Sequence, residues 1–283
     1  MPATTIKPSK AITIWLFIGL FMIFVQAIIG GITRLTGSGL SITKWEIVTG
    51  TIPPLNDTQW QGEFDLYKQT PQYLKINADM TLAEFKFIYF WEYFHRLWAR
   101  LMGFVFAVPF AFFWRKGMIS ADLKKRLIIV FLLASFVASF GWIMVASGLI
   151  NRPWVNAYKL SLHLCLALFL YSYLLWASLK HAFPNVEIQT DTATRKMYRF
   201  IIVLLSAQLF LGGIMSGMKA GLLYPTWPKM GDEWLPQLML NSMNWKLDEF
   251  MEYDRQPFVS ALVHIAHRMA AYLLAAMVLW VLF

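Results

Sequence analysis

The residues that could carry chemistry are a few ionisable side chains inside long apolar segments. Ionisable groups within membrane helices are costly and by default indicate function. At 1.5 Å per residue, three of the histidines lie about one to three turns from the outer ends of their segments, so we expect them near one level in the outer leaflet. The group consists of Glu92, His95, Arg96, Arg100, His163, His264, His267 and Arg268, and the three histidines are His95, His163 and His267.

Two imidazoles from facing helices at one depth can bind a haem iron axially. We predict this for His95 with His163, although an interhelical hydrogen bond is the ordinary role of a single buried histidine. The haem propionates would need cations near the water interface. Suitable cations are Arg96 and Arg100, one turn apart, and Arg34 and Arg152 at the predicted interface.

Glu92 lies one turn before His95 on the same helix face. Its carboxylate could orient the histidine, relay protons or stabilise positive charge on a reacting carbon. The structural alternative is an ion pair with Arg96 at the favourable i,i+4 spacing. We favour a functional role because burial of a carboxylate in an apolar helix is costly.

The composition places these residues in a membrane protein. Of 283 residues, 58% are hydrophobic and 14% are charged, with a mean hydropathy of +0.52, whereas a soluble domain has about 25% charged residues. One cysteine, Cys165, excludes an internal disulfide and a multi-cysteine metal site. Segments of about 20 apolar residues are long enough to span a bilayer as helices, and they lie at about 11–31, 88–114, 127–149, 159–180, 198–217 and 257–283.

The charges predict the orientation of these helices. The N-terminus and the loops at 115–126 and 180–199 carry 11 Lys and Arg against three acids, whereas the remaining loops carry 11 against 12. The basic loops are short, so by density of positive charge we predict them, and the N-terminus, to be cytoplasmic. The net charge of +9 therefore reports topology, and no basic stripe supports a nucleic-acid partner.

An internal repeat predicts a duplicated fold. Residues 26–32 and 208–214 both begin with Gln and end in Gly-Gly-Ile, and each is followed by a long loop and a helix bearing His-Arg. We predict an all-α polytopic membrane protein built as a duplicated four-helix bundle, with six helices present of an expected eight. The predicted domains are 1–185 and 186–283, the second incomplete. The abrupt apolar end at Phe283 favours a truncated chain over an unusual C-terminus.

These motifs resemble the haem A synthase family over nearly the whole chain. The resemblance is carried by the stretch from Gly30 to Ser41, Glu92-Tyr93-Phe94-His95-Arg96, His163, Thr226-Trp227-Pro228 and His267-Arg268. The outer loop has no cysteines, which resembles the proteobacterial and mitochondrial branch. No Arg-rich transit peptide precedes the first segment, so we expect a bacterial inner-membrane protein.

The resemblance implies eight helices in two bundles and oxidation of the C8 methyl of haem O to the formyl group of haem A, for terminal oxidases. It implies that His95 and His163 bracket haem O, that Glu92 is the catalytic carboxylate, and that His267 is an axial ligand of haem B. Arg34, Arg96, Arg100 and Arg268 would bind the haem groups. The expected partners are membrane lipid, an electron acceptor of unknown identity, haem O synthase and a second copy of the chain.

Two other classes of protein share some of these features. A haem-binding electron-transfer subunit of the cytochrome b type would explain paired histidines, but not Glu92 or the repeated Gly-Gly segments. A proton-coupled transporter would explain intramembrane Glu and Arg, but the half-helix breaks that such folds use at the midplane are not evident.

Overall fold

The computed structural model describes residues 9–44, 49–150, 152–186 and 189–282. Within these ranges the regular secondary structure is helical, and six helices are long and apolar enough to span a membrane. This confirms the predicted all-α polytopic membrane protein. The six are α1 (Lys10–Leu35), α4 (Leu82–Arg115), α5 (Ala121–Gly148), α6 (Ala157–Ala182), α7 (Thr192–Gly217) and α9 (Phe258–Leu282).

The two long loops contain short helices that hydropathy did not predict. The first loop forms η1 (Thr49–Thr51), α2 (Asp57–Tyr67) and α3 (Pro71–Ile76). The second forms η2 (Ala220–Leu222), η3 (Gln237–Met239), η4 (Ser242–Asn244) and α8 (Leu247–Met251). The described parts of both loops are therefore folded.

Several spanning helices begin earlier than their apolar segments, because polar caps start them. The Thr81 side chain accepts a hydrogen bond from the Glu84 N–H, and the Glu84 carboxylate accepts from the Thr81 N–H in return. This capping box satisfies two donors that a helix start leaves open. Asp191 caps α7 in a similar way, by accepting from the Thr194 N–H. Polar first turns thus extend α4 and α7 beyond the apolar segments.

The cap of α4 gives a first prediction. Replacing Thr81 with alanine is expected to destabilise the start of α4 by about 1 kcal/mol, the usual value of such a cap. Hydrogen exchange of the amides in the first turn of α4, measured in detergent, would show the loss as faster exchange. Ser206→Ala is the control, because that exposed hydroxyl bonds only within its own helix, to the Ile202 carbonyl. Equal exchange in both variants would contradict the capping role.

The chain forms two compact units. The first comprises Met1–Val155 and Leu166–Glu187, and the second Asn156–Cys165 and Ile188–Phe283. The beginning of α6 thus belongs with α7 and α9, whereas the rest of α6 belongs with α1, α4 and α5. The predicted bundle boundary at residue 185 stays a prediction.

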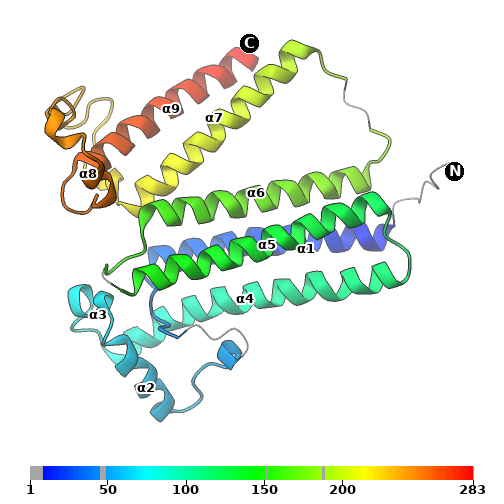
Figure 1. The fold of residues 1–283 in the computed structure, drawn as a ribbon, viewed down its shortest axis with the longest axis horizontal. Coiled ribbons are helices and arrows are strands. Elements are labelled where there is room, and N and C mark those ends of the chain that lie inside the picture. Colours follow the sequence, from blue (N-terminus) through cyan, green and yellow to red (C-terminus); the bar gives the residue numbers. More distant parts are fainter. Residues whose placement is uncertain (1–8, 45–48, 151, 187–188, 283) are drawn as a thin grey trace. The chain divides into compact units, whose positions relative to one another are not determined.

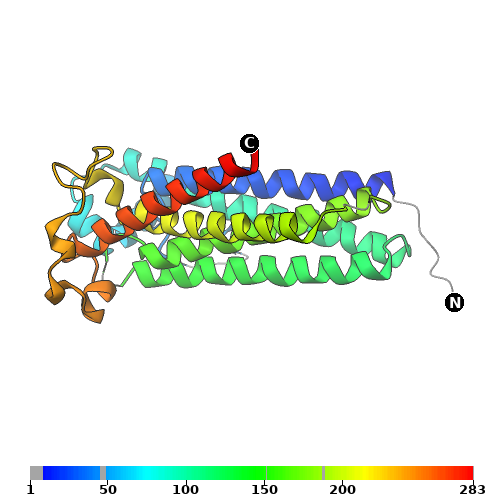
Figure 2. The ribbon, with the colours of Figure 1, turned by 90° about the horizontal axis from the view of Figure 1, so that it is seen from above.

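In the first unit, α1, α4 and α5 run side by side in alternating directions (Figures 1 and 2). Their shared core has Leu16 of α1 and Leu127 of α5 almost fully buried, together with Leu174 of α6. The Trp15 indole donates to the Val105 carbonyl at 2.8 Å, which ties α1 to α4. In the first loop, α2 packs on the start of α4 through Phe64, Tyr67 and Phe85.

In the second unit, small residues let α6 and α7 approach closely. A Cβ added at Gly213 would lie 2.9 Å from the Cα of Ser161, and one at Gly217 would lie 2.7 Å from the Cα of Ala157. The Ser161 hydroxyl donates to the Phe210 carbonyl across this contact. Glycine at these two positions is therefore required by packing, as is usual between membrane helices.

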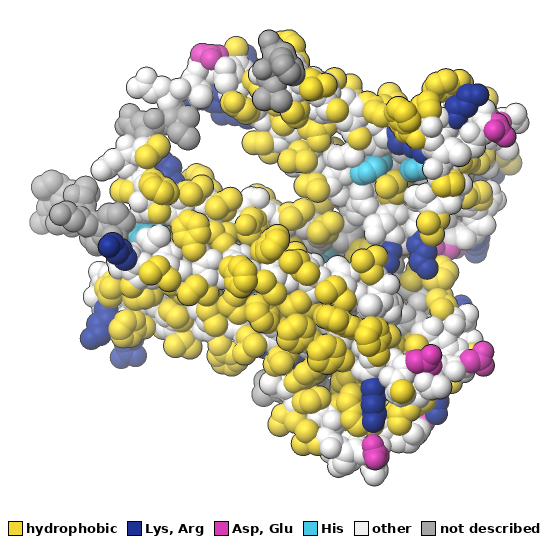
Figure 3. All heavy atoms as spheres, turned by 180° about the vertical axis from the view of Figure 1, so that it is seen from behind, with side chains coloured by type: hydrophobic (Ala, Val, Ile, Leu, Met, Phe, Trp, Pro, Cys, Tyr) yellow, Lys and Arg dark blue, Asp and Glu magenta, His cyan; other side chains and the backbone are white. Residues whose placement is uncertain are grey.

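Hydrophobic side chains cover the flanks of the helices, and charged side chains gather near their ends (Figure 3). Many large apolar residues on α1, α4 and α7 are exposed, among them Phe21 at 63%, Phe104 at 69% and Val203 at 66%. Contiguous exposed apolar surface on spanning helices is suited to contact with lipid chains. The protein is thus a multi-pass membrane protein.

Candidate functional site

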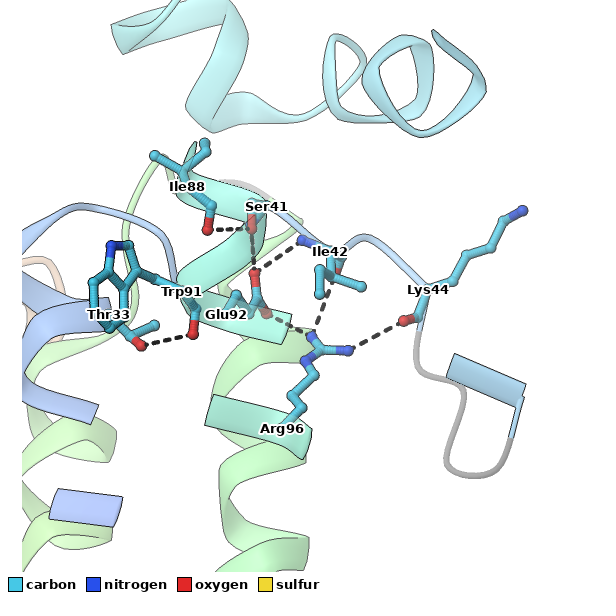
Figure 4. Close-up of polar contacts among 8 residues, drawn as sticks. All are labelled: Thr33, Ser41, Ile42, Lys44, Ile88, Trp91, Glu92 and Arg96. Atoms are coloured by element: carbon cyan, nitrogen blue, oxygen red, sulfur yellow. Dashed lines mark hydrogen bonds and ion pairs between the residues drawn. The ribbon is translucent and has the colours of Figure 1, made fainter. Parts of the chain in front are cut away.

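The Glu92 carboxylate lies buried between α4 and the loop that follows α1, with 3% of the residue exposed (Figure 4). Its Oε2 accepts hydrogen bonds from the Ser41 N–H and hydroxyl, both at 2.7 Å, and from the Ile42 N–H at 2.9 Å. Its Oε1 accepts from Arg96 at 2.6 Å. Four donors therefore surround the buried carboxylate, as a buried anion requires.

Arg96 joins the same network and extends it along the loop (Figure 4). Besides Glu92, its guanidinium donates to the carbonyl of Ile42 at 3.2 Å and to that of Lys44 at 3.3 Å. The i,i+4 ion pair considered from the sequence is thus present. Its two residues also hold the loop after α1 against the helix that carries His95.

The His95 side chain lies against α1. The Gln26 amide nitrogen is 3.1 Å from the His95 Nε2, and it also donates to the His95 carbonyl at 3.2 Å. One turn along α1, a Cβ added at Gly30 would lie 3.0 Å from the ring Cε1. A glutamine and a glycine, four residues apart on α1, thus form the wall on which the imidazole rests.

The second unit repeats this arrangement at His267. The Gln208 amide nitrogen is 3.2 Å from the His267 Nε2, and a Cβ added at Gly212 would lie 3.1 Å from the ring Cε1. The contact joins α7 to α9 as the first joins α1 to α4. The repeat seen in the sequence therefore builds the same arrangement twice. We call each arrangement an imidazole pocket: the histidine ring with the glutamine and the glycine that it contacts on the neighbouring helix.

Arg268 has a role parallel to that of Arg96. Its guanidinium donates to four backbone carbonyls of the loop after α7, at 2.5 to 3.2 Å. These are the carbonyls of Tyr224, Thr226, Pro228 and Lys229. His264 occupies the position of Glu92 and is 6% exposed, and its ring stacks on Tyr224 with 6.1 Å between centroids. The second half therefore has an arginine holding its loop, but without the buried carboxylate.

The other predicted site residues lie on the same helices. Arg34 is partly buried near the end of α1, and Arg100 is partly buried one turn beyond Arg96 on α4. His163 is partly buried on α6, within the second unit, two residues after Ser161. The structure thus brings Glu92 and Arg96 together, and it places His95 and His267 in matching pockets, each in its own unit.

Sequence reasoning missed Gln26, Gln208 and Ser41 as partners of the candidate site residues. A signal for the glutamines was present, because each stands four residues before a glycine in both copies of the repeat. It also missed that Arg96 and Arg268 donate to loop carbonyls, since this depends on how a long loop folds back.

The glycine walls give a second prediction. Gly30→Ala is expected to push the His95 ring out of place, with a destabilisation of about 1–3 kcal/mol, typical of overpacking. Gly31→Ala is the matched control, because a Cβ there would meet nothing within 4 Å. Thermal unfolding of the two purified variants would give the difference. A loss of stability in Gly31→Ala as large as that in Gly30→Ala would contradict the role of Gly30 as the wall of the pocket.

Comparison with known proteins shows which proteins the chain is related to. Residues 13–283 match the cytochrome oxidase assembly protein family. The haem A synthase of Flavobacterium johnsoniae is 39% identical over 280 residues, which cover 98% of this chain and 80% of that protein. The chain belongs to the haem A synthase family.

Further members of the family show the same level of similarity. The haem A synthase of Mesorhizobium japonicum is 40% identical over 94% of this chain and 71% of its own length. That of Flavobacterium psychrophilum is 37% identical over 98% of this chain and 80% of its own length. No solved structure gives a significant match to the chain. Both imidazole pockets and the Glu92 network lie within residues 13–283, the part of the chain that matches the family.

Proposed function

We propose that this protein is a haem A synthase of the bacterial inner membrane, which oxidises the C8 methyl of haem O to the formyl group of haem A. The observation that carries the proposal is the pair of imidazole pockets, at His95 and His267, in a chain similar along nearly its whole length to haem A synthases. The N-terminus lies in the cytoplasm, and the product serves the assembly of terminal oxidases.

The described residues fit haem groups. Imidazole nitrogens are common axial ligands of haem iron, and both pockets have a glycine wall where a Cβ would displace the ring. His95 and His163 would bind the iron of the substrate, haem O, and His267 would bind a haem B. A bound haem B would supply an iron centre that takes up and passes on single electrons.

The arginines provide positive charge for the propionates. Arg34, near the end of α1, and Arg100, one turn beyond Arg96 on α4, would bind them directly. Arg96 and Arg268 act mainly through their charge, because their guanidinium groups already donate to loop carbonyls. A charged group near an interface is effective at several ångströms when little water separates the charges.

Glu92 is the catalytic carboxylate. Conversion of a methyl to a formyl group with water as the oxygen source releases four electrons and four protons, which pass to a one-electron acceptor and to solvent. Positive charge that develops at the methyl carbon is stabilised by a fixed, buried anion. Proton uptake by Glu92 would neutralise the charge that its four donors stabilise, the Arg96 guanidinium among them, so its contacts favour this electrostatic role over that of a base.

The test is made in cells that produce haem O but have no haem A synthase of their own. After expression of this protein, haem A should appear among the extracted haems on chromatography. If haem O alone persists while the protein purifies with haem B, the protein is an electron-transfer subunit. Purification without any haem would instead favour a transporter.

A further inference from the structure

Each half of the protein has a glutamine whose amide faces the histidine of its pocket. Gln26 on α1 and Gln208 on α7 stand at equivalent positions of the repeat, and both place the amide nitrogen 3.1 to 3.2 Å from an imidazole Nε2. The contact recurs in two separate units with different surrounding side chains. It is therefore a feature of the pocket and not of one local packing arrangement.

The direction of the hydrogen bond follows from a second contact. The Gln26 amide nitrogen also donates to the His95 backbone carbonyl at 3.2 Å, and a carbonyl oxygen can only accept. The nitrogen end of the Gln26 amide thus faces the ring, so the His95 Nε2 is the acceptor. We infer the same direction for Gln208 and His267, because they stand at the equivalent positions of the repeat. A neutral imidazole whose Nε2 accepts carries its proton on Nδ1.

The lone pair that accepts this hydrogen bond is the one that would bind iron. One lone pair cannot be shared between an amide proton and a metal. The geometry points to Gln26 and Gln208 as residues that hold the ligand nitrogens while no haem is bound and must leave when iron binds. This inference rests on the proposed haem binding at His95 and His267.

The oxygen end of each glutamine amide supports the replacement of the amide by iron at Nε2. Oε1 of Gln26 and Oε1 of Gln208 are both buried, and neither accepts a hydrogen bond within the part of the chain that is described. An unsatisfied buried acceptor is costly. This glutamine conformation therefore carries a cost, and a rotation that releases Nε2 can also bring Oε1 to a donor.

The hydrogen bond also prepares the ligand. By keeping the proton on Nδ1, the amide leaves Nε2 ready to bind iron without a prior proton shift. Gln26 and Gln208 are thus positioning residues with two opposing effects. They select the tautomer that binds iron, and they compete with the iron for it.

Paired substitutions at residue 208 separate these effects. Purified haem-free protein in detergent is mixed with haem B, and uptake is followed by visible absorption. Gln208→Leu removes the competing donor, so uptake is expected to be about two- to tenfold faster, as one lost hydrogen bond implies. Gln208→Glu offers a carboxylate acceptor that draws the proton to Nε2, so uptake is expected to be slower than in the unmodified protein.

A spectroscopic signature accompanies the rates. Nitrogen NMR of labelled histidine should show His267 protonated at Nδ1 in the unmodified protein and at Nε2 in Gln208→Glu, a change that a packing role would not produce. Gln61→Leu is the control, because that exposed amide bonds to Asp65. Gln26→Leu tests the same exchange at His95.

The outcomes distinguish this inference from the proposed function. If the unmodified protein takes up no haem B, the proposed haem site fails and the inference fails with it. If it takes up haem B but Gln208→Leu does so at the same rate, only the inference is wrong. Slower uptake or weaker retention in Gln208→Leu would also overturn it, since the glutamine would then help to hold the haem.

Discussion

Glu92→Gln is expected to lower haem A production by about 100-fold or more, because it removes the buried negative charge while it keeps the shape of the side chain. Loss of one fixed electrostatic contact to a transition state commonly costs about 10²–10³ in rate. An amide NH₂ would also have to face either Arg96 or the Ser41 and Ile42 donors. The measurement is the ratio of haem A to haem O in extracted membranes.

Ser41→Ala separates catalysis from anchoring of the loop. It removes one of the four donors to Glu92 and leaves the charge in place. Most haem A production is expected to remain in this variant. If Ser41→Ala and Glu92→Gln lost activity equally, Glu92 would serve to anchor the loop and its catalytic role would be refuted. Asp65→Asn, a change in an exposed ion pair with Lys68, should have little effect.

His95→Ala and His267→Ala are expected to have large and different effects. His95→Ala should stop conversion, with haem O accumulating at least about 100-fold over haem A, since changes in groups that merely support a metal ligand already cost 10- to 100-fold. His267→Ala should instead lose the protein-bound haem B. Chromatography of the haem extracted from each purified variant would distinguish the two patterns.

His181→Ala provides the control for these two variants. His181 lies near the far end of α6 and belongs to neither imidazole pocket. It should retain the haem content of the unmodified protein. Loss of the same haem from His95→Ala and His267→Ala would contradict the assignment of separate roles to the two halves.

The membrane helices could be predicted from the sequence because a run of about 20 apolar residues has few other stable solutions. Their ends could not be read from hydropathy, since Thr81 and Asp191 start α4 and α7 through hydrogen bonds. The short helices of the loops were missed for a similar reason. They depend on packing, such as that of Phe64 and Tyr67 on α4, and not on a membrane.

The histidine pockets could be predicted in part. The repeat pointed to His95 and His267 as equivalent residues, and the structure places both on a glycine wall. The i,i+4 spacing also raised the ion pair of Glu92 with Arg96. The backbone donors of Ser41 and Ile42 lie about 50 residues away in the chain, so no local pattern could indicate them.

The two arginines that hold the loops have a mechanical consequence. His95 and Arg96 are adjacent on one helix, as are His267 and Arg268, and successive helical residues point about 100° apart. In each pair the histidine thus faces a neighbouring helix, and the arginine faces a loop. A rotation of α4 or α9 that moved the imidazole would also pull on the loop carbonyls. The loop therefore restrains rotation of the helix that carries the proposed iron ligand.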